Sequence, residues 1–173
     1  MKNSKICAVF ILMVFCLAWG GVCAAEVFSG DIQRGTLNNW KVGDEVVIEK
    51  LVNDIGNPPQ KPSFGHYQYF DDGFEMIIAE DKGKMVLYGI VIYKENFKDG
   101  DNTFSGFAGN ISPSFDVINR IEKVVSVFGD PQIMHGDVWG MTDLVYQMPF
   151  GKTQFAFDSS GELQLVEMTM VSK

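Results

Sequence analysis

Two stretches of the chain, IEKLVNDIGNP at residues 48–58 and IEKVVSVFGDP at residues 121–131, decide the fold because they are variants of one sequence. They lie 73 positions apart, and six of the eleven aligned residues are identical. The apolar residues of each stretch recur at helical spacing. Each stretch ends in Gly-x-Pro, which is typical of a helix that stops at a glycine and is followed by a residue that cannot continue it. The sequence therefore predicts the same helix twice.

The similarity extends on both sides of this helix, in the same order in each copy. Upstream, Phe28-Ser29-Gly30 recurs as Phe104-Ser105-Gly106, and downstream Tyr69, Gly73 and Gly83 recur as Tyr146, Gly151 and Gly161. An ordered series of matches at a nearly constant offset indicates an internal duplication. We expect one repeat over residues 27–93 and a second over residues 103–171. The polar, turn-rich residues 94–102 between them are expected to form a linker.

Each repeat is predicted to contain one helix followed by three strands. The helices are expected at 44–55, capped by Asp44, and at 113–128, where Ser112 would cap the helix and Pro113 would occupy its first position. The strands are expected at 66–70, 74–80 and 85–93 in the first repeat, and at 144–148, 152–157 and 163–171 in the second. A glycine supplies the positive φ of the last hairpin turn in each repeat.

These elements predict an α+β fold. A single helix buries its apolar stripe most simply on one face of its own antiparallel meander. Two meanders in tandem can then join at their edges into a wider sheet, which removes two exposed edges. This arrangement leaves one large sheet face without helices.

The N-terminal 25 residues have the three parts of a secretory signal: Lys2 and Lys5, an apolar run, and a small-residue exit at Ala24-Ala25. The alternatives are an uncleaved anchor helix, since about 20 apolar residues can cross a bilayer, and a lipid anchor on Cys23. All three cysteines lie in this segment, so the mature chain would contain none. We expect a periplasmic or extracellular protein with no stable membrane insertion after cleavage.

The negative net charge of the chain disfavours some classes of binding partner. Removing the signal segment would change the formal net charge from −8 to −10. Such a chain repels phosphate backbones, so no nucleic-acid partner is predicted. The acidity also disfavours docking on an anionic membrane. It is compatible with a basic protein partner, although solubility alone would explain it.

The repeat resembles that of the β-lactamase-inhibitor-protein fold, and a similar single unit occurs in the small lipoproteins of outer-membrane assembly. The resemblance rests on Gly56-Asn57-Pro58, Gly129-Asp130-Pro131, the paired Tyr69 and Tyr146, and the paired Gly83 and Gly161. It implies a concave sheet that holds a protein partner with aromatic side chains. The inhibitor proteins carry disulfides, whereas the mature chain would contain no cysteine. The lipoproteins carry a lipidated cysteine, and Cys23 lacks the sequence context typical of one.

No catalytic, cofactor or metal site is predicted. The chain contains no Gly-x-Ser-x-Gly, phosphate-binding loop or Rossmann fingerprint. His66 and His135 occupy similar places in the two copies, but zinc needs three or four protein ligands. Asp71 and Asp72 precede a glycine and are more simply a turn than a catalytic carboxylate pair.

Protein binding is the function that the sequence favours, and inhibition of a secreted or cell-envelope enzyme is one form of it. Tyrosine and tryptophan dominate binding hot spots. The candidate binding residues, each of which could equally be a packing residue, are Tyr67, Tyr69, Tyr88, Trp139 and Tyr146. Loops 57–65 and 130–140 differ between the copies, so specificity is expected there. The alternatives are a structural component of an envelope assembly, and a small-molecule binder with its ligand in the groove between the repeats.

Overall fold

The computed structural model describes residues 27–99, 101–136 and 141–171. The predicted signal segment and Trp139 lie outside these residues. No helix within the described ranges is long and apolar enough to cross a membrane.

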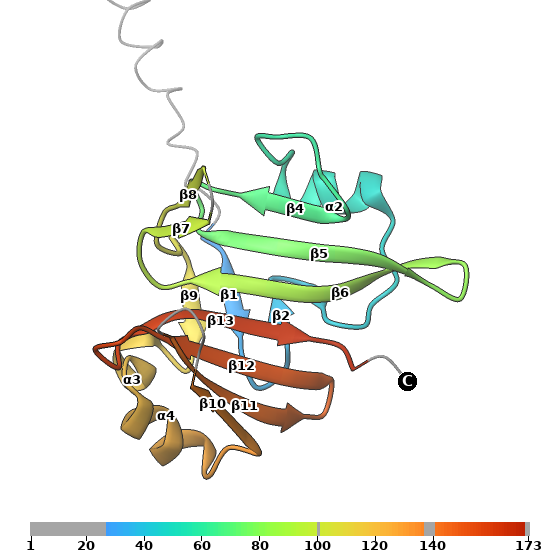
Figure 1. Cartoon of the computed structure of the whole chain (residues 1–173). Coiled ribbons are helices and arrows are strands. Elements are labelled where there is room, and N and C mark those ends of the chain that lie inside the picture. The colour runs from blue at the N-terminus through green and yellow to red at the C-terminus, as the bar shows by residue number, and fades with distance from the viewer. Residues whose placement is uncertain (1–26, 100, 137–140, 172–173) are drawn as a thin grey trace, which may run out of the picture.

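A seven-stranded antiparallel sheet forms one layer of the molecule, in the order β10-β11-β12-β13-β6-β5-β4 (Figure 1). Its two meanders join where β6 and β13 pair, with Val91 opposite Glu167. The predicted α+β class, with helices packed on antiparallel sheet, is confirmed. The bounds of the strands are β4 His66–Tyr69, β5 Phe74–Asp81, β6 Lys84–Tyr93, β10 Ile133–Gly136, β11 Thr142–Met148, β12 Gly151–Phe157 and β13 Leu163–Thr169.

The second layer contains the helices and a four-stranded sheet, which lies behind the large sheet in Figure 1. The small sheet has the order β3-β2-β1-β9, and β1 pairs in parallel with β9. One continuous apolar core fills the space between the layers and draws on both repeats, with Leu51 and Val124 as the fully buried residues of the two main helices. The elements of this layer are β1 Ser29–Asp31, β2 Thr36–Leu37, β3 Trp40–Lys41, β9 Asn110–Ser112, α2 Ile48–Ile55, α3 Phe115–Ile118 and α4 Ile121–Phe128.

The helices are shorter than predicted. α2 begins at Ile48 because residues 41–46 pair instead with the outer part of β6; for example, the Val46 amide donates to the Met85 carbonyl. Asp44 is therefore not the helix cap, and its carboxylate accepts from the Lys41 amide.

The second predicted helix, 113–128, is two helices, α3 and α4. The chain leaves the helical conformation at Arg120, which forms an isolated bridge with Glu162. Ser112 is not a cap because it belongs to β9, and Ser114 precedes α3 without a side-chain capping bond.

Two segments expected to be loops contain strands. The predicted linker 94–102 includes β7 (Phe97–Asp99) and the start of β8 (Asn102–Phe104), which form a hairpin. Phe97 and Phe104 stack on Tyr93 with ring centroids 5.2 and 4.1 Å apart, and they make a small second core at one end of the large sheet. The predicted loop 130–140 contains β10, which pairs with β11.

One hydrogen bond occurs at the same place in both repeats. The Tyr69 hydroxyl donates to the carbonyl of Gly56 at 3.1 Å, and the Tyr146 hydroxyl donates to that of Gly129 at 3.0 Å. Both glycines end their helices with positive φ. β4 in the first repeat and β11 in the second are thus each tied to the end of the helix that precedes them.

Candidate functional site

The helices and the small sheet cover only one face of the seven-stranded sheet, and we call the opposite side the open face. Because side chains alternate along a strand, the pairing register assigns residues to this face. One row across it runs Gln68, Glu75, Val91, Glu167 and Gln154. The next row runs His66, Ile77, Gly89, Thr169 and Lys152. The centre of the open face is therefore polar and acidic rather than aromatic.

Glu75 is the most deeply buried charged residue of the open face, with 4% of its surface exposed. Its carboxylate contacts Nδ1 of His66 and accepts a 3.2 Å hydrogen bond from Nε2 of Gln68. These two β4 side chains thus cover Glu75 and satisfy its carboxylate.

Glu167 occupies the corresponding position on the other side of Val91, but no described side chain pairs with it. Burial raises the pKa of its carboxyl, and the charges of Glu75 and Asp143 raise it further, while Lys152 lowers it. Lys152 is nevertheless outside ion-pair distance of Glu167. An ionised carboxylate without a partner is costly in such a position.

An exposed aromatic stands at the edge of the same sheet. Phe64 is 99% exposed and has a φ of 51°, and Gly65 follows with a φ of 83°. A type I′ turn has positive φ at both of its central residues, and it favours Asn followed by Gly at these positions. The His66 amide donates to the Ser63 carbonyl across this turn, and the Ile78 amide donates to the Gly65 carbonyl.

The Phe64 turn is fixed by its neighbours. A Cβ atom at Gly65 would overlap the carbonyl oxygen of Ile78, so only glycine fits at that position. Pro58, Pro59 and Pro62 lie in the same loop and restrict its backbone further. The side chain of Phe64 is therefore displayed by a rigid support and contributes almost nothing to the core.

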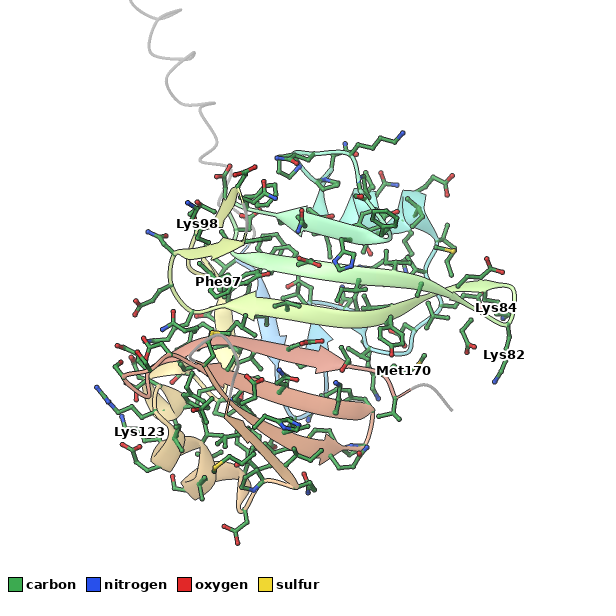
Figure 2. All side chains as sticks on the ribbon, in the orientation of Figure 1. Lys82, Lys84, Phe97, Lys98, Lys123 and Met170 are labelled. Atoms are coloured by element: carbon green, nitrogen blue, oxygen red, sulfur yellow. The ribbon has the colours of Figure 1, made fainter. Side chains whose placement is uncertain are left out.

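A groove of about 500 Å³ lies between the two repeats. It separates the outer end of the β5–β6 hairpin from the β11–β12 turn and the end of β13. Its apolar wall includes Val86, Tyr88, Phe150 and Met170, and its rim carries Glu80, Asp81 and Lys82. Figure 2 labels Lys82 and Met170 on this side of the molecule.

The predicted binding tyrosines are separated by the structure. Tyr69 and Tyr146 are 3% exposed and belong to the main core, and Tyr67 packs against the same core from β4. These three side chains therefore do not form an exposed surface on the open face. Tyr88 is half-buried and lines the groove between the repeats. Burial raises the pKa of Tyr69 to about 12.

The two histidines lie at opposite edges of the large sheet, His66 on β4 and His135 on β10. Within the described ranges, no three His, Cys, Asp or Glu residues are grouped so as to hold a metal ion.

Sequence reasoning did not identify Phe64, Glu75 or Glu167. The two glutamates carried a visible signal, since each interrupts an apolar strand as Phe-Glu-Met or Val-Glu-Met. Alternation places such a residue on the face opposite its neighbours. Phe64 carried only a weak signal, the glycine that follows it, because exposure depends on how the loop is attached to β5.

No protein-family model matches the chain, and no curated protein matches it. Among solved structures, the chain is similar to a DUF4309 family protein (YjgB) from Bacillus subtilis subsp. subtilis str. 168. The two are 11% identical over 76% of this chain and 82% of that chain, with a TM-score of 0.49. These comparisons do not confirm the β-lactamase-inhibitor-protein fold.

Proposed function

We propose that the chain is an exported, non-catalytic protein that binds a protein partner, with Phe64 as the main contact residue. The observation that carries this proposal is a fully exposed phenylalanine on a turn that disfavours it. A residue other than glycine or asparagine in the left-handed region costs about 1–2 kcal/mol. Burial of the Phe64 side chain does not offset this backbone cost, because the side chain is 99% exposed.

The rigidity of the turn supports a binding role. Binding costs less when the contact residue is already held in place. Gly65 and two backbone hydrogen bonds, one across the turn and one to β5, hold the Phe64 backbone before any partner arrives. Loop 57–65 is also one of the two loops in which the repeats differ, where specificity is expected.

Inhibition of a secreted or envelope enzyme is the form of binding that we favour, since a rigid loop that presents one apolar side chain suits insertion into a pocket. This form also agrees with the resemblance to the inhibitor-protein repeat. The alternative, a structural component of an envelope assembly, predicts association with several envelope proteins rather than with one soluble enzyme.

The test is capture of the partner by immobilised protein from the extracellular and envelope fractions of the source cells. Phe64→Ala should weaken capture by about 30-fold, the loss expected for a hot spot of about 2 kcal/mol. Phe64→Tyr should retain most of it. Val117→Ala is the matched control, because Val117 is exposed and apolar but lies on α3.

The outcomes separate the alternatives. Recovery of one soluble enzyme whose activity falls on addition of the chain would support inhibition, and recovery of several membrane proteins would support the structural role. Equal capture by the wild type and by Phe64→Ala would refute Phe64 as the contact residue.

One observation favours small-molecule binding as a second candidate. The groove beside Tyr88 has a volume in the range of ligand sites, and both apolar and charged residues line it. A metabolite that binds there would raise the melting temperature of the wild type. Tyr88→Ala should abolish that rise.

A further inference from the structure

A pocket of about 420 Å³ lies in the first repeat, between the small sheet and the last turn of α2. Pockets of about 300–1,000 Å³ are usual for small ligands. It shares no lining residue with the groove between the repeats. Five of its seven lining residues have short polar side chains: Ser29, Asn38, Asn39, Asn53 and Asp54.

The wall of the pocket on the small sheet is held by two hydrogen bonds. The backbone amide of Ser29 donates to Oδ1 of Asn38 at 2.8 Å, and the backbone amide of Asn38 donates to the Ser29 carbonyl at 2.6 Å. Because Oδ1 of Asn38 is engaged in this way, Nδ2 keeps both of its N–H donors. Asn38 has a φ of 51°, a conformation that asparagine tolerates. This wall is therefore fixed before any ligand binds.

The wall of the pocket on α2 consists of Asn53 and Asp54, which are both exposed. No other described residue forms a hydrogen bond or an ion pair with either side chain. Asp54 lies in the last turn of α2, where the helix dipole disfavours a negative charge. The corresponding positions of α4 hold Ser126 and Val127, so this pair of residues is confined to the first repeat. Asp54 thus does not stabilise its helix and is free to bind a ligand.

Trp40 is the buried residue of the lining. It is only 5% exposed, and Nζ of Lys50 lies 5.3 Å from the centroid of its ring, so we assign it no direct ligand contact. Lys50 itself does not line the pocket.

The chemistry of the lining restricts the ligand. One carboxylate and no basic side chain line the pocket, which disfavours an anion. Calcium takes about six to eight oxygen ligands, several of them charged, and in the part of the chain that the structure describes no three His, Cys, Asp or Glu residues are grouped to hold a metal ion. An apolar ligand would desolvate these polar groups without replacing their hydrogen bonds with water. A neutral ligand with many hydrogen-bonding groups remains.

We infer that this pocket binds a sugar residue, a neutral ring that carries several hydroxyl groups. A hydroxyl both donates and accepts hydrogen bonds, and so does the side-chain amide of asparagine. The Asp54 carboxylate accepts charge-assisted hydrogen bonds from sugar hydroxyls. Nδ2 of Asn38 donates to a hydroxyl oxygen on the opposite side, and Asn53 can do either. This inference goes beyond partner binding by Phe64 and does not depend on it.

The test is titration of the ¹⁵N-labelled mature chain with the methyl glycosides of glucose, galactose, mannose and N-acetylglucosamine, each added separately. We expect at least one glycoside to shift the side-chain amide signals of Asn38, Asn39 and Asn53 until they saturate. Three comparison compounds should shift these signals far less at the same concentration. They are cyclohexanol, which has a ring but one hydroxyl, N-acetylglycinamide, which offers backbone-like amides, and calcium chloride.

Variants then identify the groups involved. Asp54→Asn should weaken binding of the glycoside about tenfold, because it removes charge-assisted hydrogen bonds. Asn53→Ala should weaken it about fivefold, the loss expected for a neutral hydrogen bond. Both residues are exposed, so both variants should keep the backbone amide spectrum of the folded chain. Glu122→Gln, which removes one carboxylate from α4, is the matched control and should leave binding unchanged.

The hexasaccharide of the sugar that binds distinguishes the two sources of such a ligand. Tighter binding of the hexasaccharide than of the methyl glycoside assigns the pocket to a glycan chain, and equal binding assigns it to a single sugar; both results support a sugar site.

Three results overturn the inference. They are no saturable shift with any of the glycosides, equal shifts with any of the comparison compounds, or unchanged glycoside binding in both Asp54→Asn and Asn53→Ala. The pocket does not include Phe64, so the outcome of partner capture by Phe64→Ala is a separate result.

Discussion

Replacing Phe64 with asparagine should stabilise the protein. Phe64 has a φ of 51° and is 99% exposed, so the substitution relieves an unfavourable backbone conformation and removes almost no buried area. Asparagine tolerates the left-handed region far better than phenylalanine. Of the 1–2 kcal/mol at stake, we expect about 1 kcal/mol to be recovered. For a chain of this size, that corresponds to a rise in Tm of about 3–4 °C.

The chain contains a matched control for this substitution. Lys82 and Gly83 form the turn between β5 and β6, with φ values of 52° and 81°, which closely match those of Phe64 and Gly65. Lys82 is also exposed, at the tip of its hairpin (Figure 2). Lys82→Asn should therefore stabilise the protein by a similar amount.

Urea unfolding of the mature chain and the two variants measures the effect. Both variants should shift the midpoint upward with an unchanged m-value, which indicates a change in stability alone. Only Phe64→Asn should lose partner capture. A midpoint that falls in Phe64→Asn while it rises in Lys82→Asn would show that Phe64 stabilises the fold, and the reasoning for a binding role would fail.

Three further predictions test the fold and the open face by urea unfolding. Tyr69→Phe and Tyr146→Phe should each cost about 1 kcal/mol, because each removes the same hydrogen bond to a helix-ending glycine; a large difference between them would argue against equivalent repeats. Gly65→Ala should cost about 3 kcal/mol and Gly83→Ala about 1 kcal/mol, because both strain the backbone but only the first places a Cβ atom against a carbonyl oxygen. Because the pKa of Glu167 is raised, the folded state binds the Glu167 proton more tightly than the unfolded state does. Glu167 therefore lowers the free energy of unfolding as the pH rises from about 4.5, its ordinary pKa, through its pKa in the folded state. Glu167→Gln should therefore raise the free energy of unfolding at pH 7 and reduce its decline over that pH range, and an unchanged pH profile would contradict the assignment.

The fold class could be predicted because the signals for it are local and occur twice. The helix stops at Gly56 and Gly129 depend on Gly-x-Pro, and the hairpins depend on a glycine in each turn. The lengths of the helices could not be predicted, because long-range pairing determines them. Residues 41–46 bind the outer end of β6 instead of extending α2, and no local pattern reports that competition.

The candidate site was predicted less well than the fold, for a physical reason. The tyrosines that the sequence favoured are amphipathic, and in Tyr69 and Tyr146 the hydroxyl is satisfied inside the core by a carbonyl. An aromatic residue on a strand can therefore lie either on the core face of the sheet or on its open face. The open face was expected to be aromatic, but its central rows are mostly polar, and the missed glutamates are the residues that define it.

Two positions, one in each repeat, contradict the usual requirements of a stable fold. Phe64 exposes an aromatic ring on a turn that suits asparagine, and Glu167 buries part of a carboxylate without pairing it. Each position has a simple substitution, to asparagine or glutamine, that should increase stability. Folded proteins tolerate such costs mainly where function requires them. If Phe64→Asn stabilises the chain and weakens partner binding, stability and recognition oppose each other at this position. If either substitution destabilises the chain, that residue belongs to the scaffold.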